Sequence, residues 1–230
     1  MRSKFYLFAT LCLIAASLFT FAQVGSNRVK TDSVVLITST GCRSAETRTV
    51  GTVIDGGFIL TVAHGVAGQT LNQITTANGT VFAATVAALD IDLDLALLRL
   101  EVDPESQLST PLQLAAAEPG ERVSFVAFDD QDQFIREAKI KRRLKINTQD
   151  IYLNNKTSRP GLEVELEVKV GNSGGPLINK SGEVVGIVWS TSRVVKNRSW
   201  ATRSEAVTAL LAAASTDASP LNSKALACTG

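Results

Sequence analysis

The sequence has 230 residues, almost no excess of charge and a single histidine. Lysine and arginine number 23 against 22 aspartates and glutamates, so the formal net charge is +1. A nucleic-acid-binding protein needs a basic excess to neutralise phosphates, so no nucleic-acid partner is expected. His64 alone cannot build a metal site of several histidines, and no cluster of cysteines replaces them. We therefore expect no metal and no other cofactor.

One local basic cluster is present, KIKRRLKI at residues 139–146. Basic and apolar residues alternate there, a pattern typical of a strand with one solvated face. Such a face needs no special partner.

Long hydrophobic runs are confined to the N-terminus. Basic residues precede an uncharged run from Phe5 to Phe21, and Thr20 and Ala22 supply the small side chains of a signal-peptidase site. Residues 1–22 are interpreted as a secretory signal peptide. The alternative is an uncleaved anchor, because the run is nearly long enough to span a bilayer. In both cases the rest of the chain is expected to be extracytoplasmic, secreted or periplasmic, with membrane contact only if this segment is uncleaved.

Cysteine is scarce. Cys12 would leave with the signal peptide, so the mature chain would keep only Cys42 and Cys228. In an oxidising compartment two cysteines form one obvious pair, which would tie the first strands to the extreme C-terminus. The alternative is two unpaired thiols.

From Ser33 onward the chain consists of short apolar runs broken by turn residues, with little helical periodicity. Asp55-Gly56-Gly57 predicts a turn between two strands, and Asn78-Gly79 predicts a two-residue hairpin. A segment rich in Pro, Ser and Glu, residues 101–121, is expected to cross the surface as a linker between two β-rich halves. Strands are expected at 33–39, 49–54, 57–62, 74–77, 80–89, 94–102, 122–128, 136–146, 150–154, 162–170, 175–179 and 183–190.

The fold class that follows is all-β, with two small antiparallel barrels packed together and one closing helix at 204–215. Residues 23–118 would form the N-terminal barrel and linker, and residues 119–230 the C-terminal barrel, helix and tail. Within LEVELEVKV, residues 162–170, the alternation predicts four charged residues on one face and apolar residues on the other. The charged residues are Glu163, Glu165, Glu167 and Lys169.

His64 lies where an apolar strand, ILTVAHG, runs into glycine. A proton-transfer role would need an acid to orient it and a group for it to activate. Asp90, Asp92 and Asp94 all precede the strand LALLRL, and Asp94 lies directly against that apolar run, where a carboxylate would be shielded from water. Position alone leaves the alternatives open: an ordinary core or surface histidine, and aspartates that only cap a strand.

The sequence GNSGGPL, residues Gly171–Leu177, supplies a candidate nucleophile, Ser173. The glycines alone would fit a tight turn. A serine that attacks an acyl carbon also needs backbone N–H groups aimed at the developing oxyanion. Gly171 permits a conformation that points its N–H inward beside that of Ser173, so Gly171, Asn172 and Ser173 are the candidate oxyanion hole.

Three segments resemble those of trypsin-like serine proteases: ILTVAHGV, DLDLALLRL and GNSGGPLINKSGEVVGIVWS. They occur in that family's order His, Asp, Ser. The details are most similar to the bacterial extracytoplasmic HtrA branch, without its peptide-binding PDZ domain, and the cysteine placement is similar to proteases of the MarP kind. The resemblance covers nearly all of residues 33–212. It implies the chymotrypsin fold, with two six-stranded barrels and a catalytic cleft between them.

The same resemblance implies a serine endopeptidase that acts on protein or peptide substrates without a cofactor, with His64 as base, Asp94 as orienting acid and Ser173 as nucleophile. By similarity, the edge strand that pairs with substrate comprises Val188, Trp189, Ser190 and Thr191, although Trp189 could equally be a core residue. A preference for small or medium apolar side chains before the scissile bond is a hypothesis. The alternative function, from another class, is a catalytically silent protein-binding module on the same fold. The oligomeric state is not predicted.

Overall fold

The computed structural model of the protein describes residues 31–42, 44–101, 108–216, 221 and 226–229. The expected signal peptide, residues 1–22, lies outside these ranges. Among the described helices, none has the length and apolar character needed to cross a membrane.

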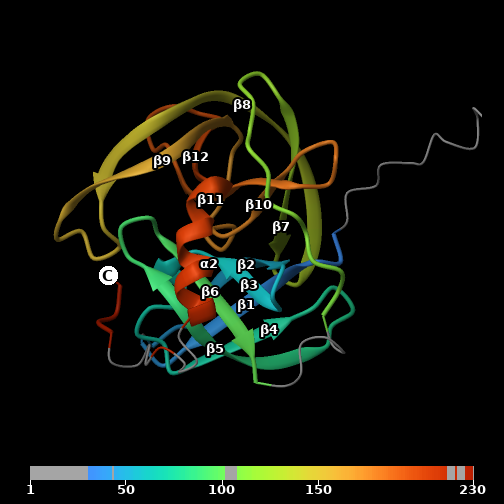
Figure 1. The fold of residues 1–230 in the computed structure, drawn as a ribbon, viewed down its shortest axis with the longest axis vertical. Helices are drawn as coiled ribbons and strands as arrows, with labels where there is room; N and C mark the ends of the chain where they lie inside the picture. The colour runs from blue at the N-terminus through green and yellow to red at the C-terminus, as the bar shows by residue number, and fades with distance from the viewer. Residues whose placement is uncertain (1–30, 43, 102–107, 217–220, 222–225, 230) are drawn as a thin grey trace, which may run out of the picture.

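The first half of the chain forms a closed six-stranded antiparallel barrel, coloured blue to green in Figure 1. The strand order is β1-β2-β3-β6-β5-β4, and the pairing of β1 with β4 closes the barrel. Val35, Ile59 and Leu98 are among the buried side chains of its interior, and their removal from water stabilises the barrel. The strands are β1 (Val34–Thr40), β2 (Thr47–Ile54), β3 (Phe58–Thr61), β4 (Leu71–Thr75), β5 (Val81–Asp90) and β6 (Leu95–Leu100).

The second half repeats this architecture in the order β10-β11-β12-β9-β8-β7, closed by the pairing of β10 with β7. Phe125, Leu162 and Leu177 are among its fully buried side chains. The predicted fold class of two packed antiparallel barrels is therefore confirmed. The strands are β7 (Arg122–Asp129), β8 (Asp132–Gln149), β9 (Lys156–Glu165), β10 (Pro176–Ile178), β11 (Val184–Thr191) and β12 (Arg198–Arg203).

The interface between the barrels is part of the hydrophobic core. One buried cluster contains Leu60 and Leu97 of the first barrel together with Phe125 and Val188 of the second. Because protein interiors are closely packed, this shared core fixes the position of residues from one half relative to the other.

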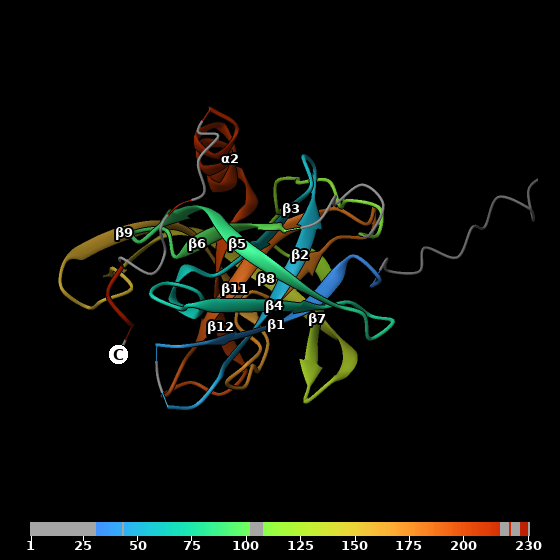
Figure 2. The same cartoon turned by 90° about the horizontal axis from the view of Figure 1, so that it is seen from below.

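Two further segments join the barrels. In the linker, the Leu112 N–H donates to the Val53 carbonyl oxygen and the Ala115 N–H to that of Val184, both at 2.9 Å. At the C-terminus a short 3₁₀ turn, η3 (Ser204–Ala206), leads into α2 (Val207–Thr216). The helix packs against β5 and β6 of the first barrel (Figures 1 and 2). The predicted closing helix is thus confirmed.

The two expected turns have different outcomes. Between β2 and β3, Gly56 and Gly57 adopt φ values of +80° and +71°, which suit glycine, and the predicted connection is confirmed. A hairpin joins β4 to β5 around Asn78-Gly79 as predicted, but its loop of two residues is wrong, because residues 76–80 separate the two strands. The Asn78 side-chain oxygen accepts hydrogen bonds from the Thr76 hydroxyl and the Thr80 N–H, and these bonds stabilise the loop together with the backbone bond from the Thr76 N–H to the Thr80 carbonyl oxygen.

The strand expected at residues 150–154 is also wrong. This segment is the turn between β8 and β9, and the buried carboxylate of Asp150 organises it. Oδ1 accepts from the N–H groups of Tyr152 and Asn154, and Oδ2 accepts from the N–H and side-chain amide of Asn155, all at 2.9–3.0 Å. Burial opposes the charge of Asp150, but these hydrogen bonds outweigh it, so the pKa of Asp150 is lowered.

The alternation at residues 162–170 is confirmed for the apolar face as far as Val168, where the side chains of Leu162, Val164, Leu166 and Val168 are buried. It is wrong for Val170, which lies in the turn before Ser173 and is fully exposed. The charged face departs from expectation in two ways. The strand β9 ends at Glu165, and Glu163 is buried rather than solvated, because Arg142 of β8 and Arg198 of β12 pair with its carboxylate. Paired neighbours on adjacent strands thus make the burial of this charge possible.

Candidate active site

His64 and Asp94 meet at one edge of the first barrel. His64 lies in a short 3₁₀ turn, η1 (Ala63–Gly65), just after β3, and Asp94 lies just before β6. These two strands are antiparallel neighbours, with Thr61 opposite Ala96, so the residue after one strand lies beside the residue before the other. The His64 Nδ1 is 2.8 Å from Asp94 Oδ2 and 3.0 Å from Oδ1.

The buried carboxylate of Asp94 determines the tautomer of the His64 ring. Asp94 is only 4% exposed, and an ionised carboxylate only accepts hydrogen bonds, so the neutral His64 ring carries its proton on Nδ1 and leaves Nε2 as the basic nitrogen. The His64 backbone N–H also donates to Asp94 Oδ1 at 2.9 Å. Asp94 itself has φ +57°, an uncommon conformation for a residue with a side chain. Asp90 and Asp92 do not take this place: Asp90 Oδ1 accepts from the N–H groups of Asp92 and Leu93, and Asp92 is exposed.

A residue that the sequence patterns did not indicate, Arg159 of β9, contacts the same carboxylate. One of its terminal nitrogens lies 3.4 Å from Asp94 Oδ2, and Arg159 is only 3% exposed. Its guanidinium also stacks on the ring of Trp189, with 4.5 Å from Cζ to the ring centroid. Burial lowers the pKa of Arg159 against the attraction of four aspartates. These are Asp94, Asp90, Asp92 and Asp150.

Ser173 comes from the second barrel, in the loop before β10. Its carbonyl oxygen accepts from the Val50 N–H of β2 at 2.8 Å, and the next residue, Gly174, donates to the Val188 carbonyl oxygen at 2.7 Å. A Cβ on Gly174 would lie 2.0 Å from the Val50 carbonyl oxygen, so only glycine allows this close approach of the two barrels. The Ser173 hydroxyl oxygen lies 3.5 Å from the Trp189 carbonyl oxygen.

The predicted oxyanion turn is ordered by its own hydrogen bonds. The Asn172 N–H donates to the Lys169 carbonyl oxygen at 3.1 Å, and Gly171 at the third position has φ +93°, as in a type II turn. The buried Asn172 side chain accepts from the Lys169 N–H and donates to the Phe128 carbonyl oxygen. Among the described residues, the N–H groups of Gly171 and Ser173 have no acceptor.

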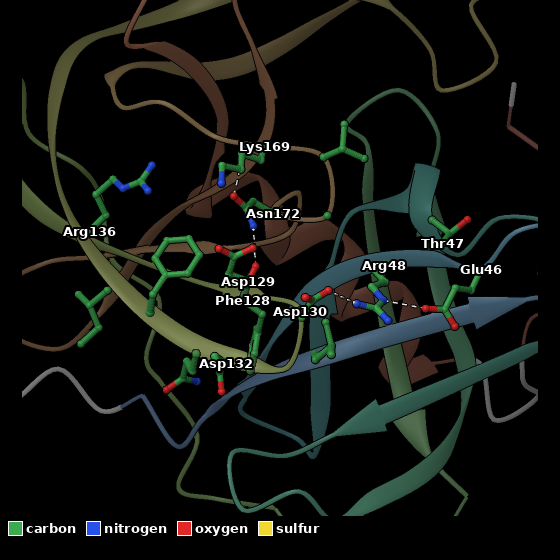
Figure 3. Close-up of a pocket in the computed structure, with 16 residues that line it drawn as sticks. Glu46, Thr47, Arg48, Phe128, Asp129, Asp130, Asp132, Arg136, Lys169 and Asn172 are labelled. Atoms are coloured by element: carbon green, nitrogen blue, oxygen red, sulfur yellow. Dashed lines mark hydrogen bonds and ion pairs between the residues drawn. The ribbon is translucent and has the colours of Figure 1, made fainter.

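A cavity of about 860 Å³ adjoins this turn (Figure 3). It lies between the Lys169–Asn172 turn, the hairpin that joins β7 to β8, and the start of β2. Arg48 reaches across its edge, where it pairs with Asp130 and Glu46. The Arg48 side chain thereby links the first barrel to the β7–β8 hairpin of the second.

The four residues expected to contact substrate lie at the end of β11. Beyond Ile187, which pairs with Pro176, β11 extends past β10. The expectation is wrong for Val188, which is buried and whose N–H and carbonyl groups bond to Gly175 and Gly174. Ser190 and Thr191 pair with β12 on one side only, and the described residues place no strand on the other side. The Trp189 ring packs against the core and Arg159, as in the core alternative, and its carbonyl oxygen faces the Ser173 hydroxyl.

The structure contains a disulfide between Cys42 and Cys228, which confirms the predicted pairing. It holds the C-terminal tail against the loop that follows His64. There the Thr229 hydroxyl donates to the His64 carbonyl oxygen at 2.8 Å. The described residues include no group of three or more His, Cys, Asp or Glu side chains arranged to hold a metal ion.

Residues 49–187 match the model of the trypsin-like peptidase domain family. The chain belongs to this family. The match contains His64, Asp94 and Ser173, the residues whose order indicated the resemblance.

Individual relatives of this trypsin-like peptidase agree with the family match. The chain is 32% identical over 148 residues to the serine protease Rv3671c of Mycobacterium tuberculosis, over 62% of this chain and 36% of that protein. It is 28% identical over 160 residues to the human serine protease HTRA4, over 70% of this chain and 33% of that protein. The chain thus spans about a third of the length of these curated relatives.

Among solved structures, the peptidase resembles the active form of the Rv3671c protease with a TM-score of 0.78 and 26% identity. The similarity covers 86% of each chain. It therefore includes both barrels rather than one.

The sequence patterns of the peptidase missed Arg159 and Asp150. Both lie in or beside a polar stretch, DIYLNNKTSRPG, which carries no catalytic motif. Arg159 lies 65 residues from its partner Asp94, in the other barrel. The one available signal is a charged residue flanked by strand-forming segments near a proline, and that pattern does not specify a buried ion pair.

Proposed function

We propose that the protein is an extracytoplasmic trypsin-like serine endopeptidase, with His64, Asp94 and Ser173 as its catalytic triad. The observation that carries this proposal is the His64–Asp94 pair, in which a buried carboxylate accepts from Nδ1 at 2.8 Å. A histidine that only filled the core would not need a buried anion at its ring. In a triad, that anion selects the tautomer and stabilises the imidazolium that forms during the reaction.

The reaction proceeds in two stages. His64 Nε2 accepts the proton of the Ser173 hydroxyl as Oγ attacks the scissile carbonyl carbon, and the carbonyl π electrons move to the oxygen. The imidazolium then gives this proton to the leaving amine, the C–N bond breaks, and an acyl-enzyme remains. In the second stage water attacks the ester carbonyl, His64 takes and returns the proton in the same way, and Ser173 is released.

The oxyanion of each stage is stabilised by the N–H groups of Gly171 and Ser173. This role is supported by the positive φ of Gly171 and by the lack of a protein acceptor for either N–H among the described residues. Asn172 ties the turn to Lys169 and Phe128, so the donors are in place before substrate binds. Such preorganisation avoids a cost of rearrangement during the reaction.

Substrate binds as an added strand along the end of β11. Trp189, Ser190 and Thr191 supply this edge, and backbone hydrogen bonds would give affinity without regard to sequence. Val188 is not part of the free edge, because its N–H and carbonyl groups already bond to Gly175 and Gly174. The cavity beside Gly171 has the size of a typical ligand site and accommodates side chains on that side of the scissile bond. Before the scissile bond we propose small or medium apolar side chains. A peptide library tests this, and a dominant preference for Arg or Lys would contradict it.

The location outside the cytoplasm is supported by two observations. The structure has a disulfide, which persists in oxidising compartments, and the first residues have the pattern of a signal peptide. Whether residues 1–22 are cleaved is tested by N-terminal sequencing of the protein exported from an expression host. A mature chain that begins after Ala22 is expected.

A fluorophosphonate probe tests the catalytic proposal, because it reacts covalently with an activated serine. We expect labelling of the wild type and none of Ser173→Ala, with labelling of His64→Ala reduced to background. The exposed Ser181→Ala serves as a matched control and should label like the wild type. Equal labelling of wild type and Ser173→Ala would contradict the proposed nucleophile. A folded wild type that binds peptides but never labels would favour the silent binding module.

A further inference from the structure

The loop that carries Asp94 is held from the opposite barrel. Three successive carbonyl oxygens of this loop accept hydrogen bonds from the second barrel. Ile91 accepts from the Ile151 N–H at 3.1 Å, Asp92 from Arg159 Nε at 2.7 Å, and Leu93 from the Thr202 hydroxyl at 3.1 Å. The acid of the proposed triad therefore belongs to the first barrel in sequence but is fixed by the second.

Arg159 is the centre of these contacts. Nε donates to the Asp92 carbonyl oxygen, one terminal nitrogen contacts Asp94 Oδ2, and the other donates to the Gln149 carbonyl oxygen at 3.0 Å. All three guanidinium nitrogens are engaged, and the flat face rests on Trp189. Only a planar group with several fixed donors can make these contacts together.

The same side chain also connects the acid to the nucleophile. Its guanidinium contacts Asp94 at the edge and Trp189 on the face, and the Trp189 carbonyl oxygen lies 3.5 Å from the Ser173 hydroxyl. Arg159 thus spans the boundary between the half of the site that holds the base and the half that holds the nucleophile.

We propose that Arg159 is a positioning residue for catalysis, which acts by holding the Asp94 carboxylate in the orientation that His64 requires. The proposal rests on the proposed function of the triad. Asp94 has φ +57°, an unfavourable conformation that surrounding contacts must maintain. Arg159 supplies both a charge at the Asp94 carboxylate and a hydrogen bond to the carbonyl oxygen of Asp92, two residues earlier. A shift of the acid by about 1 Å from its productive position costs on the order of 10²-fold in rate.

The expected effect is on turnover and not on substrate binding, because Arg159 lies behind the acid, with its side chain almost completely buried. Arg159→Gln should lower kcat by about 10- to 100-fold with KM within about twofold of the wild type. Arg159→Lys keeps the charge but cannot make the three contacts at once, so kcat should fall by at least about threefold and stay above that of Arg159→Gln. Thermal unfolding checks that each variant is folded.

A matched control is available on the neighbouring strand. Like Arg159→Gln, Arg142→Gln removes a guanidinium that pairs with a buried carboxylate, here that of Glu163. Glu163 keeps Arg198 as a partner, and it is not part of the proposed triad. We expect its kcat and KM to equal those of the wild type.

A double-mutant cycle separates a role through Asp94 from a general structural role. In an Asp94→Asn background, Arg159→Gln should lower kcat by less than about twofold further, because the group on which it acts is already changed. Losses that multiply in the double mutant, or a folded Arg159→Gln with wild-type kcat, would overturn the proposal. If Arg159→Gln does not fold, Arg159→Lys takes its place in both measurements. A folded Arg159→Lys with wild-type kcat, or a loss of kcat that multiplies with that of Asp94→Asn, would then overturn the proposal. Failure of the triad itself would show separately, as absence of Ser173-dependent labelling in the wild type.

Discussion

Asp94 accepts hydrogen bonds from both the ring Nδ1 and the backbone N–H of His64, at 2.8 and 2.9 Å. A single bond to the ring would fix the tautomer but would let the histidine backbone shift. With the second bond, the carboxylate also fixes the start of the 3₁₀ turn that carries the ring. The His64 ring therefore has little freedom to move away from Asp94.

The first prediction concerns this pair. Asp94→Asn should preserve the fold but offer an amide in place of the acceptor, which favours the wrong tautomer of His64. We expect kcat to fall by about 10³–10⁴-fold with little change in KM. Asp92→Asn, at an exposed position two residues away, should leave kcat close to that of the wild type. Steady-state kinetics on a peptide substrate measures both, and comparable losses in the two variants would contradict the assignment of the acid.

The second prediction concerns the turn before Ser173. A Cβ on Gly171 would make only an ordinary contact, 3.9 Å from the Arg48 Cβ, so Gly171→Ala tests backbone conformation without a clash. At φ +93° alanine costs about 1–2 kcal/mol, and relief of this strain would turn the N–H away from the oxyanion. We expect kcat to fall by about 5- to 30-fold.

Gly120→Ala is the matched control, with φ +86° and no heavy atom within 4 Å of the added methyl group. Both variants should lose a similar amount of thermal stability, but only Gly171→Ala should lose kcat. An equal loss of kcat in both would show that the effect is not that of an oxyanion hole.

The sequence predicts the two-barrel fold and the residues of the His64–Asp94 pair because local motifs carry them. An apolar run that ends at histidine, and an aspartate placed against LALL, remain recognisable without knowledge of their partners. Arg159 is different, because its function depends on which strand of the other barrel reaches the Asp94 loop. No local sequence pattern encodes which strand of the second barrel lies next to the Asp94 loop.

The errors have a related cause. Asp150 and Asn78 have short polar side chains that bond to nearby backbone groups, so the first makes a turn where a strand was predicted and the second stabilises a longer loop than predicted. The β-rich composition around these residues favours strands, so composition alone does not show that their side-chain hydrogen bonds favour a turn. Glu163 is buried only because arginines on both neighbouring strands pair with it, which a single strand cannot reveal.

The third prediction concerns pH. Since the pKa of Asp150 is lowered in the folded state, its charged form stabilises the fold above about pH 4, and this contribution is lost as the pH falls through the lowered pKa. Asp150→Asn would place an amide NH₂ opposite the two donors of Asn155. We expect a lower Tm than the wild type at pH 7, and a difference that shrinks below pH 4.

Thermal unfolding at pH 7, 5 and 3 measures this difference. The exposed Asp132→Asn is the control, and its Tm should follow that of the wild type at every pH. A gap for Asp150→Asn that stays constant from pH 7 to pH 3 would show that the carboxylate charge is not involved.

The fourth prediction concerns the disulfide. The bridge joins residues 186 positions apart, and restriction of so long a loop in the unfolded chain contributes at most about 5 kcal/mol. Cys42→Ser with Cys228→Ser should therefore lower Tm, by about 2–4 °C for each kcal/mol lost. Reducing agent should lower the Tm of the wild type to that of the double variant and leave the double variant unchanged. A wild type that is insensitive to reductant, with the bond shown to be reduced, would contradict this account.

The bridge between Cys42 and Cys228 also makes a covalent ring that contains His64, Asp94 and Ser173. One peptide-bond break anywhere inside this ring opens it without separating the pieces. A molecule cut once by a protease within this ring would keep its mass, apart from one added water, and would fall into fragments only when the disulfide is reduced. For a protein exposed to proteases, this topology means that one cut changes the connectivity of the chain and does not release a fragment.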